Sequence, residues 1–184
     1  MRFLNGLLAA SLLPVFACAY PVTSTGSAGV SHASSADVAP VRATGSAYGA
    51  TEARIFDLIN AERQHQGLRP LVFNSQLNQM AMIQARNMAY YQKMAHVIPN
   101  ATLPTLGDRA HYVGYTFGRL SENVALGYPN AETVVEGWMN SRGHRQNILD
   151  GGVVETGIAI ARSATGGLYY CQVFGRQLSL GGSL

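Results

Sequence analysis

The chain has 184 residues, 47% of them hydrophobic and 12% charged, with a formal net charge of +3 and two cysteines. Its length suits one domain with tails. Two cysteines exclude a scaffold built on disulfides, and the lack of an apolar run of about 18 residues beyond the N-terminus excludes a polytopic membrane protein. The basic residues are spread singly along the chain, whereas nucleic-acid-binding proteins usually cluster them, so we expect no nucleic-acid partner.

The N-terminus has the pattern of an export signal. A positive charge at Arg2, an apolar stretch that ends at Phe16 and small residues on both sides of Cys18 predict a signal peptide over residues 1–19. The apolar stretch is shorter than the roughly 20 residues that span a bilayer, so the mature protein is expected to have no transmembrane span. The residues before Cys18 also resemble a bacterial lipobox, although Phe16 is large for its position there. Lipid anchoring through Cys18 is therefore the alternative to free secretion.

Small residues dominate the segment that follows. Residues 20–50 are rich in Ala, Ser, Thr and Gly and have no aliphatic side chain larger than Val. Such a segment cannot bury enough apolar surface to offset the entropy lost on ordering. We predict a flexible spacer over 20–50, a folded domain over 51–177, and a tail over 178–184.

Hydrophobic spacing, capping residues and turn residues predict the elements of the folded domain. In chain order they are a helix from Thr51 or Glu52 to Gly67, a short strand at 71–73, a second helix from Asn74 or Ser75 to about Lys93, an irregular stretch over 99–119, a third helix after Asn130 that Gly143 interrupts, a helical turn over 144–149, and strands at 153–161 and 168–174 joined by a turn over 163–167. In that turn, Gly166 and Gly167 are expected to supply positive φ angles. Helices precede a hairpin, which is an α+β pattern.

Several polar residues are candidates for chemistry, but each alone is a weak signal. His96 follows the second helix, Glu122 and Asn123 would by themselves indicate a turn or a cap, and a polar block covers 138–149. The chain has no HExxH zinc motif and no Gly-x-Ser-x-Gly nucleophile motif. Cys171 is expected to be a buried small hydrophobic residue, and the methionines of the second helix are expected to fill the core.

Taken together, the motifs resemble the CAP superfamily, which comprises cysteine-rich secretory proteins, antigen 5 and pathogenesis-related 1 proteins and is also called the SCP domain. The resemblance is to the bacterial branch and covers about residues 52–176. It rests on these segments: Leu58–Arg63, Gly67–Leu71, Leu77–Ala85 with Met88 and Ala89, His96, Arg109, Gly114 and Tyr115, Glu122–Ala125, Gly127 and Tyr128, Trp138–Ser141, Gly143–Leu149, Gly157, and Gln172–Gly175.

The resemblance implies a three-layer α-β-α sandwich with a central antiparallel sheet, and a cleft that two histidines and two acidic residues line. By motif, the histidines are His96 and His144, and one acid is Glu122, which Asn123 follows. The second acid would lie at or near Ser141, which is not acidic. Glu136 is not a confident substitute, because five residues along a helix separate it from that position.

Three interpretations of this cleft remain open from the residues. His96 and His144 could bind zinc or another divalent metal weakly, since a catalytic zinc normally has three protein ligands. Glu122 could then be a general base toward a metal-bound water, which is the hydrolase interpretation. Alternatively, the residues form a hydrogen-bonded polar network or a ligand cleft without catalysis, and we favour this interpretation.

The expected function is that of a secreted binding or interaction module, extracellular or periplasmic, rather than an enzyme. The family resemblance implies a lipid, a sterol or a cell-envelope component as the partner. The alternative is an extracellular metal-dependent peptidase or another hydrolase.

Overall fold

The computed structural model describes residues 49–178. The expected signal peptide with Cys18, most of the expected spacer, and residues 179–184 of the expected tail lie outside the described residues. The elements are α1 (Ala50–His65), β1 (Val72–Phe73), α2 (Ser75–Tyr91), α3 (Leu106–Tyr112), β2 (Phe117–Leu126), α4 (Ala131–Asn140), α5 (Arg142–Ile148), β3 (Glu155–Arg162) and β4 (Leu168–Gln177).

The four strands form one sheet in the order β1-β3-β4-β2. The three long strands, β2, β4 and β3, pair antiparallel, as expected. The two-residue strand β1 pairs parallel to β3, so the sheet is mixed and the prediction of a purely antiparallel sheet was wrong in this detail. Parallel pairing is possible because a long crossover containing helices separates β1 from β3 in the chain.

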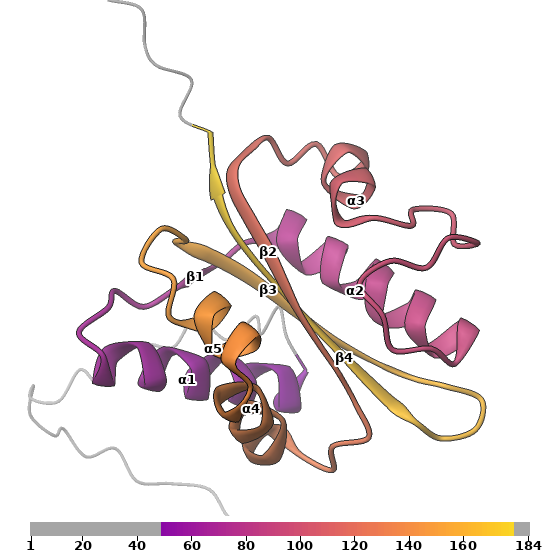
Figure 1. Ribbon diagram of the computed structural model, residues 1–184, viewed down its shortest axis with the longest axis horizontal. Helices are drawn as coiled ribbons and strands as arrows, with labels where there is room; N and C mark the ends of the chain where they lie inside the picture. Colours follow the sequence, from indigo (N-terminus) through magenta and orange to yellow (C-terminus); the bar gives the residue numbers. More distant parts are fainter. Residues whose placement is uncertain (1–48, 179–184) are drawn as a thin grey trace, which may run out of the picture. The chain divides into compact units, whose positions relative to one another are not determined.

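Helices cover both faces of this sheet, which confirms the predicted α-β-α sandwich (Figure 1). On one face, α2 and α3 pack over a core that includes Leu77, Met80, Met88, Cys171 and Val173. On the other face, α1, α4 and α5 pack over a second core that includes Ile59, Val134, Trp138, Ile158 and Phe174. Because side chains alternate along a strand, β4 contributes to both cores.

Local sequence signals set the ends of the first two helices. Gly67 has a φ of +70°, and the chain leaves α1 there, as predicted. Asn74 accepts hydrogen bonds from the backbone N–H groups of Gln76 and Leu77, which starts α2 at the predicted place. The helix ends slightly earlier than predicted, because Gln92 adopts a left-handed conformation.

Two elements lie where no regular structure was predicted. The irregular stretch contains α3, which begins with a capping box between Thr105 and Asp108. It is followed by β2, a ten-residue strand that carries Glu122 and Asn123. Taken alone, Glu122 and Asn123 indicated a turn or a cap, but they lie in the middle of β2, which is an edge strand of the sheet.

Smaller corrections concern the second half of the chain. Asn130 caps α4 as predicted, but the helix is broken at Ser141, and Gly143 lies inside α5 rather than between helices. In the β3–β4 turn only Gly166 has a positive φ. Strand β4 extends to Gln177, beyond the predicted end, because it remains paired with the start of β2.

Candidate functional site

A buried carboxylate lies at the centre of the candidate site. The side chain of Glu122 is 2% exposed, and its two oxygens have different partners. Oε1 lies 3.0 Å from His96 Nδ1, and Oε2 accepts a hydrogen bond of 2.6 Å from Arg109 Nη2. The thiol of Cys171 also donates to Oε2, at 3.5 Å. Protein groups therefore engage both oxygens of this carboxylate.

Arg109 is the cation that neutralises Glu122, and it is fully buried on α3. Its Nη1 donates to Gln84 Oε1 at 2.6 Å, and Gln84 Nε2 donates to Ala95 O at 2.6 Å. Gln84 thereby ties the segment that carries His96 to the buried ion pair. A buried charge needs this combination of an opposite charge and hydrogen bonds, because desolvation of an unpaired ion is costly.

Arg109 and Gln84 were not predicted to take part in the cleft. Arg109 was only part of the family motif, and Gln84 lay on the apolar face of its helix. One signal could have found Arg109. Thr105 and Asp108 have the spacing of a capping box, which predicts a short helix that would place Arg109 in its first turn.

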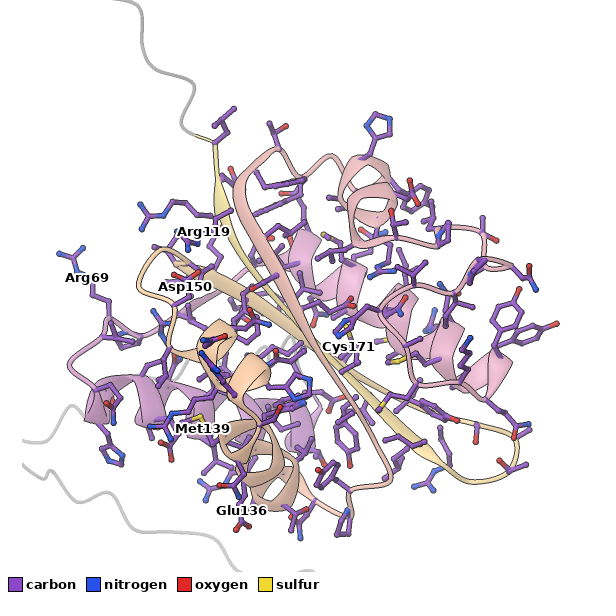
Figure 2. The ribbon with its side chains drawn as sticks, viewed as in Figure 1. Arg69, Arg119, Glu136, Met139, Asp150 and Cys171 are labelled. Atoms are coloured by element: carbon purple, nitrogen blue, oxygen red, sulfur yellow. The ribbon has the colours of Figure 1, made fainter. Side chains whose placement is uncertain are left out.

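The third polar residue on the Glu122 side is Cys171. Its thiol is buried on β4, near the middle of the sheet in Figure 2. Burial, followed by the charge of Glu122, raises the pKa of Cys171 well above its usual value. This favours the protonated thiol, and the predicted burial of Cys171 is confirmed.

The second histidine, His144, is held by a residue of β2 that points to the other face of the sheet. Asn123 points to the face opposite Glu122, and its Nδ2 donates to His144 O at 3.1 Å. Asn147 Nδ2 donates to Asn123 Oδ1 at 2.9 Å and to Glu122 O at 3.2 Å. These bonds fix α5, and with it the backbone of His144, against the sheet.

The two imidazoles have opposite electrostatic surroundings. The hydrogen bond to Glu122 raises the pKa of His96 above its usual value, although burial and Arg109 act against this. Burial lowers the pKa of His144, and the charge of His96 lowers it further. His144 is therefore neutral at pH 7, while His96 is the histidine that Glu122 favours as a cation.

A small pocket of about 220 Å³ opens beside His144. Its walls are Ser141, His144 and mostly apolar neighbours: Met94, Val124, Ala125, Leu126, Tyr128, Gly137 and Trp138. His96 and Glu122 do not line it. The structure thus brings His144 together with Ser141, and His96 together with Glu122, while Asn123 connects the two pairs.

The described residues at this cleft do not form a metal site with three or more protein ligands. Within residues 49–178, no group of three or more His, Cys, Asp or Glu side chains is placed to hold one. Glu122 is an unfavourable ligand, because its side chain is buried and its charge is already paired with Arg109. The position of the second acid is Ser141. Two imidazoles remain, one fewer than the three protein ligands of a catalytic zinc.

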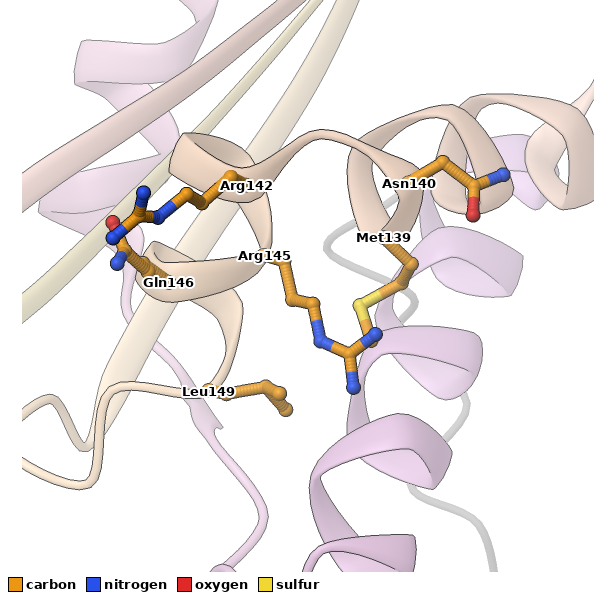
Figure 3. A pocket seen from close by; sticks show the side chains of 6 residues that line it. All are labelled: Met139, Asn140, Arg142, Arg145, Gln146 and Leu149. Carbon is orange, nitrogen blue, oxygen red and sulfur yellow. The ribbon is translucent and has the colours of Figure 1, made fainter.

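A larger hollow of about 520 Å³ lies beside the end of α4 and α5. Figure 3 shows its lining residues, which come from the end of α4 and from α5 and the residue that follows it. Arg145 extends toward Met139, while Arg142 and Gln146 lie together on another side of α5. None of the predicted cleft residues lines this hollow.

Comparison with known protein families matches residues 56–174 to the cysteine-rich secretory protein family, or CAP family. The match covers more than half of the chain. This chain belongs to that family.

Bacterial proteins are among the relatives of this CAP domain. The uncharacterized protein YkwD of Bacillus subtilis is 34% identical over 120 residues, which are 65% of this chain and 46% of YkwD. A solved structure of an extracellular SCP-domain protein from Bacillus anthracis is 30% identical, with a TM-score of 0.63, over 69% of this chain and 40% of that one. An outer surface protein from Borrelia burgdorferi, 20% identical over 67% of this chain and 90% of its own, shares the fold with a TM-score of 0.61.

The chain spans less than half the length of the curated relatives that it matches, 46% of one and 34% of another. The shared part is the CAP domain itself, with His96, Glu122 and His144 inside the matched range. Every helix between residues 49 and 178 is too short or too polar to cross a membrane.

Proposed function

We propose that this protein is a secreted binding module whose CAP domain holds a ligand at the His144 pocket and performs no hydrolysis. The observation that carries the proposal is the double engagement of Glu122. A general base must be reached by the water or substrate that it deprotonates. Here the Glu122 side chain is 2% exposed, and Arg109 and His96 each hold one of its oxygens, so water and substrate have little access to this carboxylate.

The chemistry of the pocket supports an amphipathic ligand. Met94 and Leu126 are 49% and 41% exposed, and Trp138 forms part of the buried wall. The neutral imidazole of His144 and the hydroxyl of Ser141 supply polar groups at the same wall. Few polar groups on an apolar wall are typical of a small-molecule site. At about 220 Å³ the pocket would hold one end of a lipid or sterol, with the remainder lying over Met94 and Leu126.

The place of action that we propose is outside the cytoplasm. The expected signal peptide supports it, and so does the likeness to an extracellular SCP-domain protein of Bacillus anthracis. Attachment to the envelope through a lipidated Cys18 is the alternative, and the mass of the mature N-terminus distinguishes the two.

The binding test uses the single tryptophan of the chain. Because Trp138 lines the pocket, we expect its fluorescence to change when a long-chain fatty acid or a sterol is titrated into the full chain. Leu126→Glu and Met94→Glu place charges at the rim and should each weaken binding by about tenfold, or roughly 1.4 kcal/mol. Val72→Glu, at a residue 64% exposed on β1, is the matched control and should bind as the wild type does.

Two outcomes would contradict the proposal. One is the absence of any saturable fluorescence change with either ligand. The other is hydrolysis of a peptide or ester substrate in the presence of added zinc, lost with chelator and in His144→Ala. The second result would establish the metal-dependent hydrolase instead, with Glu122 released from its present partners.

A further inference from the structure

A third pocket lies away from the cleft, where the end of α1, the start of β3 and the end of β4 meet. It has a volume of about 320 Å³, and three arginines line it: Arg63, Arg69 and Arg176. We name it the arginine pocket. Part of its wall is the segment 67–70, which belongs to the family motif but contributes nothing to the cleft.

Arg63 is a buried cation whose hydrogen bonds go to neutral groups. It is 2% exposed and donates to the carbonyl oxygens of Arg69, Ile148 and Asp150 at 3.0, 2.6 and 2.9 Å. Its Nη2 has one long contact, 3.5 Å to Val153 O, although it carries two N–H groups. Within residues 49–178, Arg63 forms no ion pair. Arg63 therefore adds a buried positive charge to the wall of the pocket.

A fourth arginine lies beside this pocket, opposite Arg176 on the neighbouring strand. Arg119 on β2 is the register partner of Arg176 on β4. Like charges directly opposite on paired strands are unfavourable. Asp150 relieves part of this repulsion through an ion pair of 2.5 Å with Arg119 Nε. Figure 2 labels Arg119 and Asp150 side by side, with Arg69 extending from the loop at the same end.

The local charge balance leaves an excess of positive charge. Four guanidinium groups gather here, and the carboxylate of Asp150 pairs with one of them, that of Arg119. The side chains of Arg69 and Arg176 make no ion pair or hydrogen bond with any other residue in the range 49–178. Both are exposed at the rim, so they are free to close on a ligand.

We propose that the arginine pocket binds the phosphate group of a small extracellular solute. Arginine presents planar pairs of N–H donors that match phosphate and carboxylate oxygens. A phosphate group, with more than one negative charge, matches three arginines better than a single carboxylate does. Leu68, Pro70 and Val153 form an apolar part of the wall, against which the carbon skeleton of the solute would lie.

The test is calorimetric titration of the full chain with inorganic phosphate at constant ionic strength. We expect saturable binding that Arg69→Ala/Arg176→Ala weakens by at least about tenfold. Arg63 is left unchanged, because its bonds hold together several backbone segments and its loss would disturb the fold. The matched control is Arg142→Ala/Arg145→Ala, which removes the same charge from the hollow beside α5.

The control separates a site from a general effect of charge. Retention of phosphate binding in Arg142→Ala/Arg145→Ala, with loss in Arg69→Ala/Arg176→Ala, supports the proposal. Equal weakening in both variants, or no saturable heat with the wild type, overturns it. Since the Trp138 titration concerns a different pocket, either proposal can fail without the other.

Discussion

At the scale of single residues, His96 and His144 make the stability of the fold depend on pH in opposite directions. Glu122 raises the pKa of His96 in the folded chain, and burial lowers the pKa of His144. A histidine whose pKa is raised by folding stabilises the fold. This stabilisation is complete at a pH below the pKa in the unfolded chain, and it is lost as the pH rises through the pKa in the folded chain. For a histidine whose pKa is lowered by folding, stability is highest at a pH above the pKa in the unfolded chain. It is lost as the pH falls through the pKa in the folded chain.

Together, these two effects predict that the contribution of the histidines to the free energy of unfolding passes through a maximum as the pH is varied. Because both histidines titrate near about 6.5 when unfolded, the gain from His96 is complete just where the penalty from His144 begins. We expect the free energy of unfolding of the wild type, minus that of His96→Gln/His144→Gln, to be greatest near pH 6.5. Urea denaturation over the range from about pH 5 to 8 measures this difference. The maximum should be shallow, because the His96 side chain is 56% exposed.

Single variants show which histidine causes each slope. His96→Gln should remove the loss on the alkaline side and leave most of the loss on the acidic side, because burial of His144 is its first cause. It should also raise the pKa of His144 part of the way to its usual value, since burial of His144 remains, and NMR of the imidazole follows this directly. A difference that changes in one direction over the whole pH range would contradict the assignment of opposite pKa shifts to the two histidines.

At the scale of elements, α2 and β3 pack closely against each other at Gly157. A Cβ atom built on Gly157 would collide with the backbone of Leu77 and Asn78. The same approach lets Asn78 Oδ1 accept a hydrogen bond from the backbone N–H of Ile158 at 3.2 Å. We expect Gly157→Ala to destabilise the fold by about 1–3 kcal/mol, because backbone atoms, unlike a side chain, cannot rotate away.

The control for this substitution is Gly143→Ala on α5. Nothing lies within 4 Å of a Cβ atom at Gly143, and alanine is the better helix former by about 0.8–1.0 kcal/mol. Chemical denaturation should therefore place the two variants on opposite sides of the wild type. Equal stability of Gly157→Ala and the wild type would mean that α2 does not need this close approach.

The elements that could be predicted from the sequence are those with strong local signals. The cap at Asn74, the exit at Gly67 and the cap at Asn130 are local, so α1, α2 and α4 were found. Strand β2 was missed because polar residues occupy its buried middle. Glu122 and Asn123 can be buried there because residues on α3 and α5 form hydrogen bonds with them, and these partners are distant in the sequence.

The same reason limits prediction of the site. Motif resemblance indicated His96, Glu122 and His144, but spacing along a chain contains no information on which oxygen is already engaged. Gln84 has the position of a core residue on its helix, and only the fold brings it to Arg109. The position of Ser141 between α4 and α5, which the structure shows as a break between two helices, likewise could not be read from the motif.

At the scale of the whole molecule, the polar network around β2 joins the two helical layers. Glu122 reaches Arg109 on the face that α2 and α3 cover. Asn123 reaches α5 on the opposite face, through His144 O and Asn147. The contacts on both faces of one strand therefore hold the layers in register. We infer that damage to this network affects the stability of the entire domain rather than one loop.

Glu122→Ala is the variant that tests this role. It would leave Arg109 buried without its counter-ion, and breaking one partner of a buried pair costs about 3–5 kcal/mol. Glu132→Ala is the matched control, since it breaks the exposed Arg54–Glu132 pair between α1 and α4, whose side chains are 54% and 56% exposed. Solvent screens such a pair, so this variant should unfold almost as the wild type does.

The measurement is unfolding by urea, followed by circular dichroism for the helices and by Trp138 fluorescence for the α4 side of the sheet. For Glu122→Ala both signals should shift together to lower urea, since Glu122 lies on one face of β2 and Trp138 packs on the other. If circular dichroism alone shifted while Trp138 kept its midpoint, the α2 and α3 layer would unfold by itself. The network would then stabilise one face of the sheet and would not join the two layers.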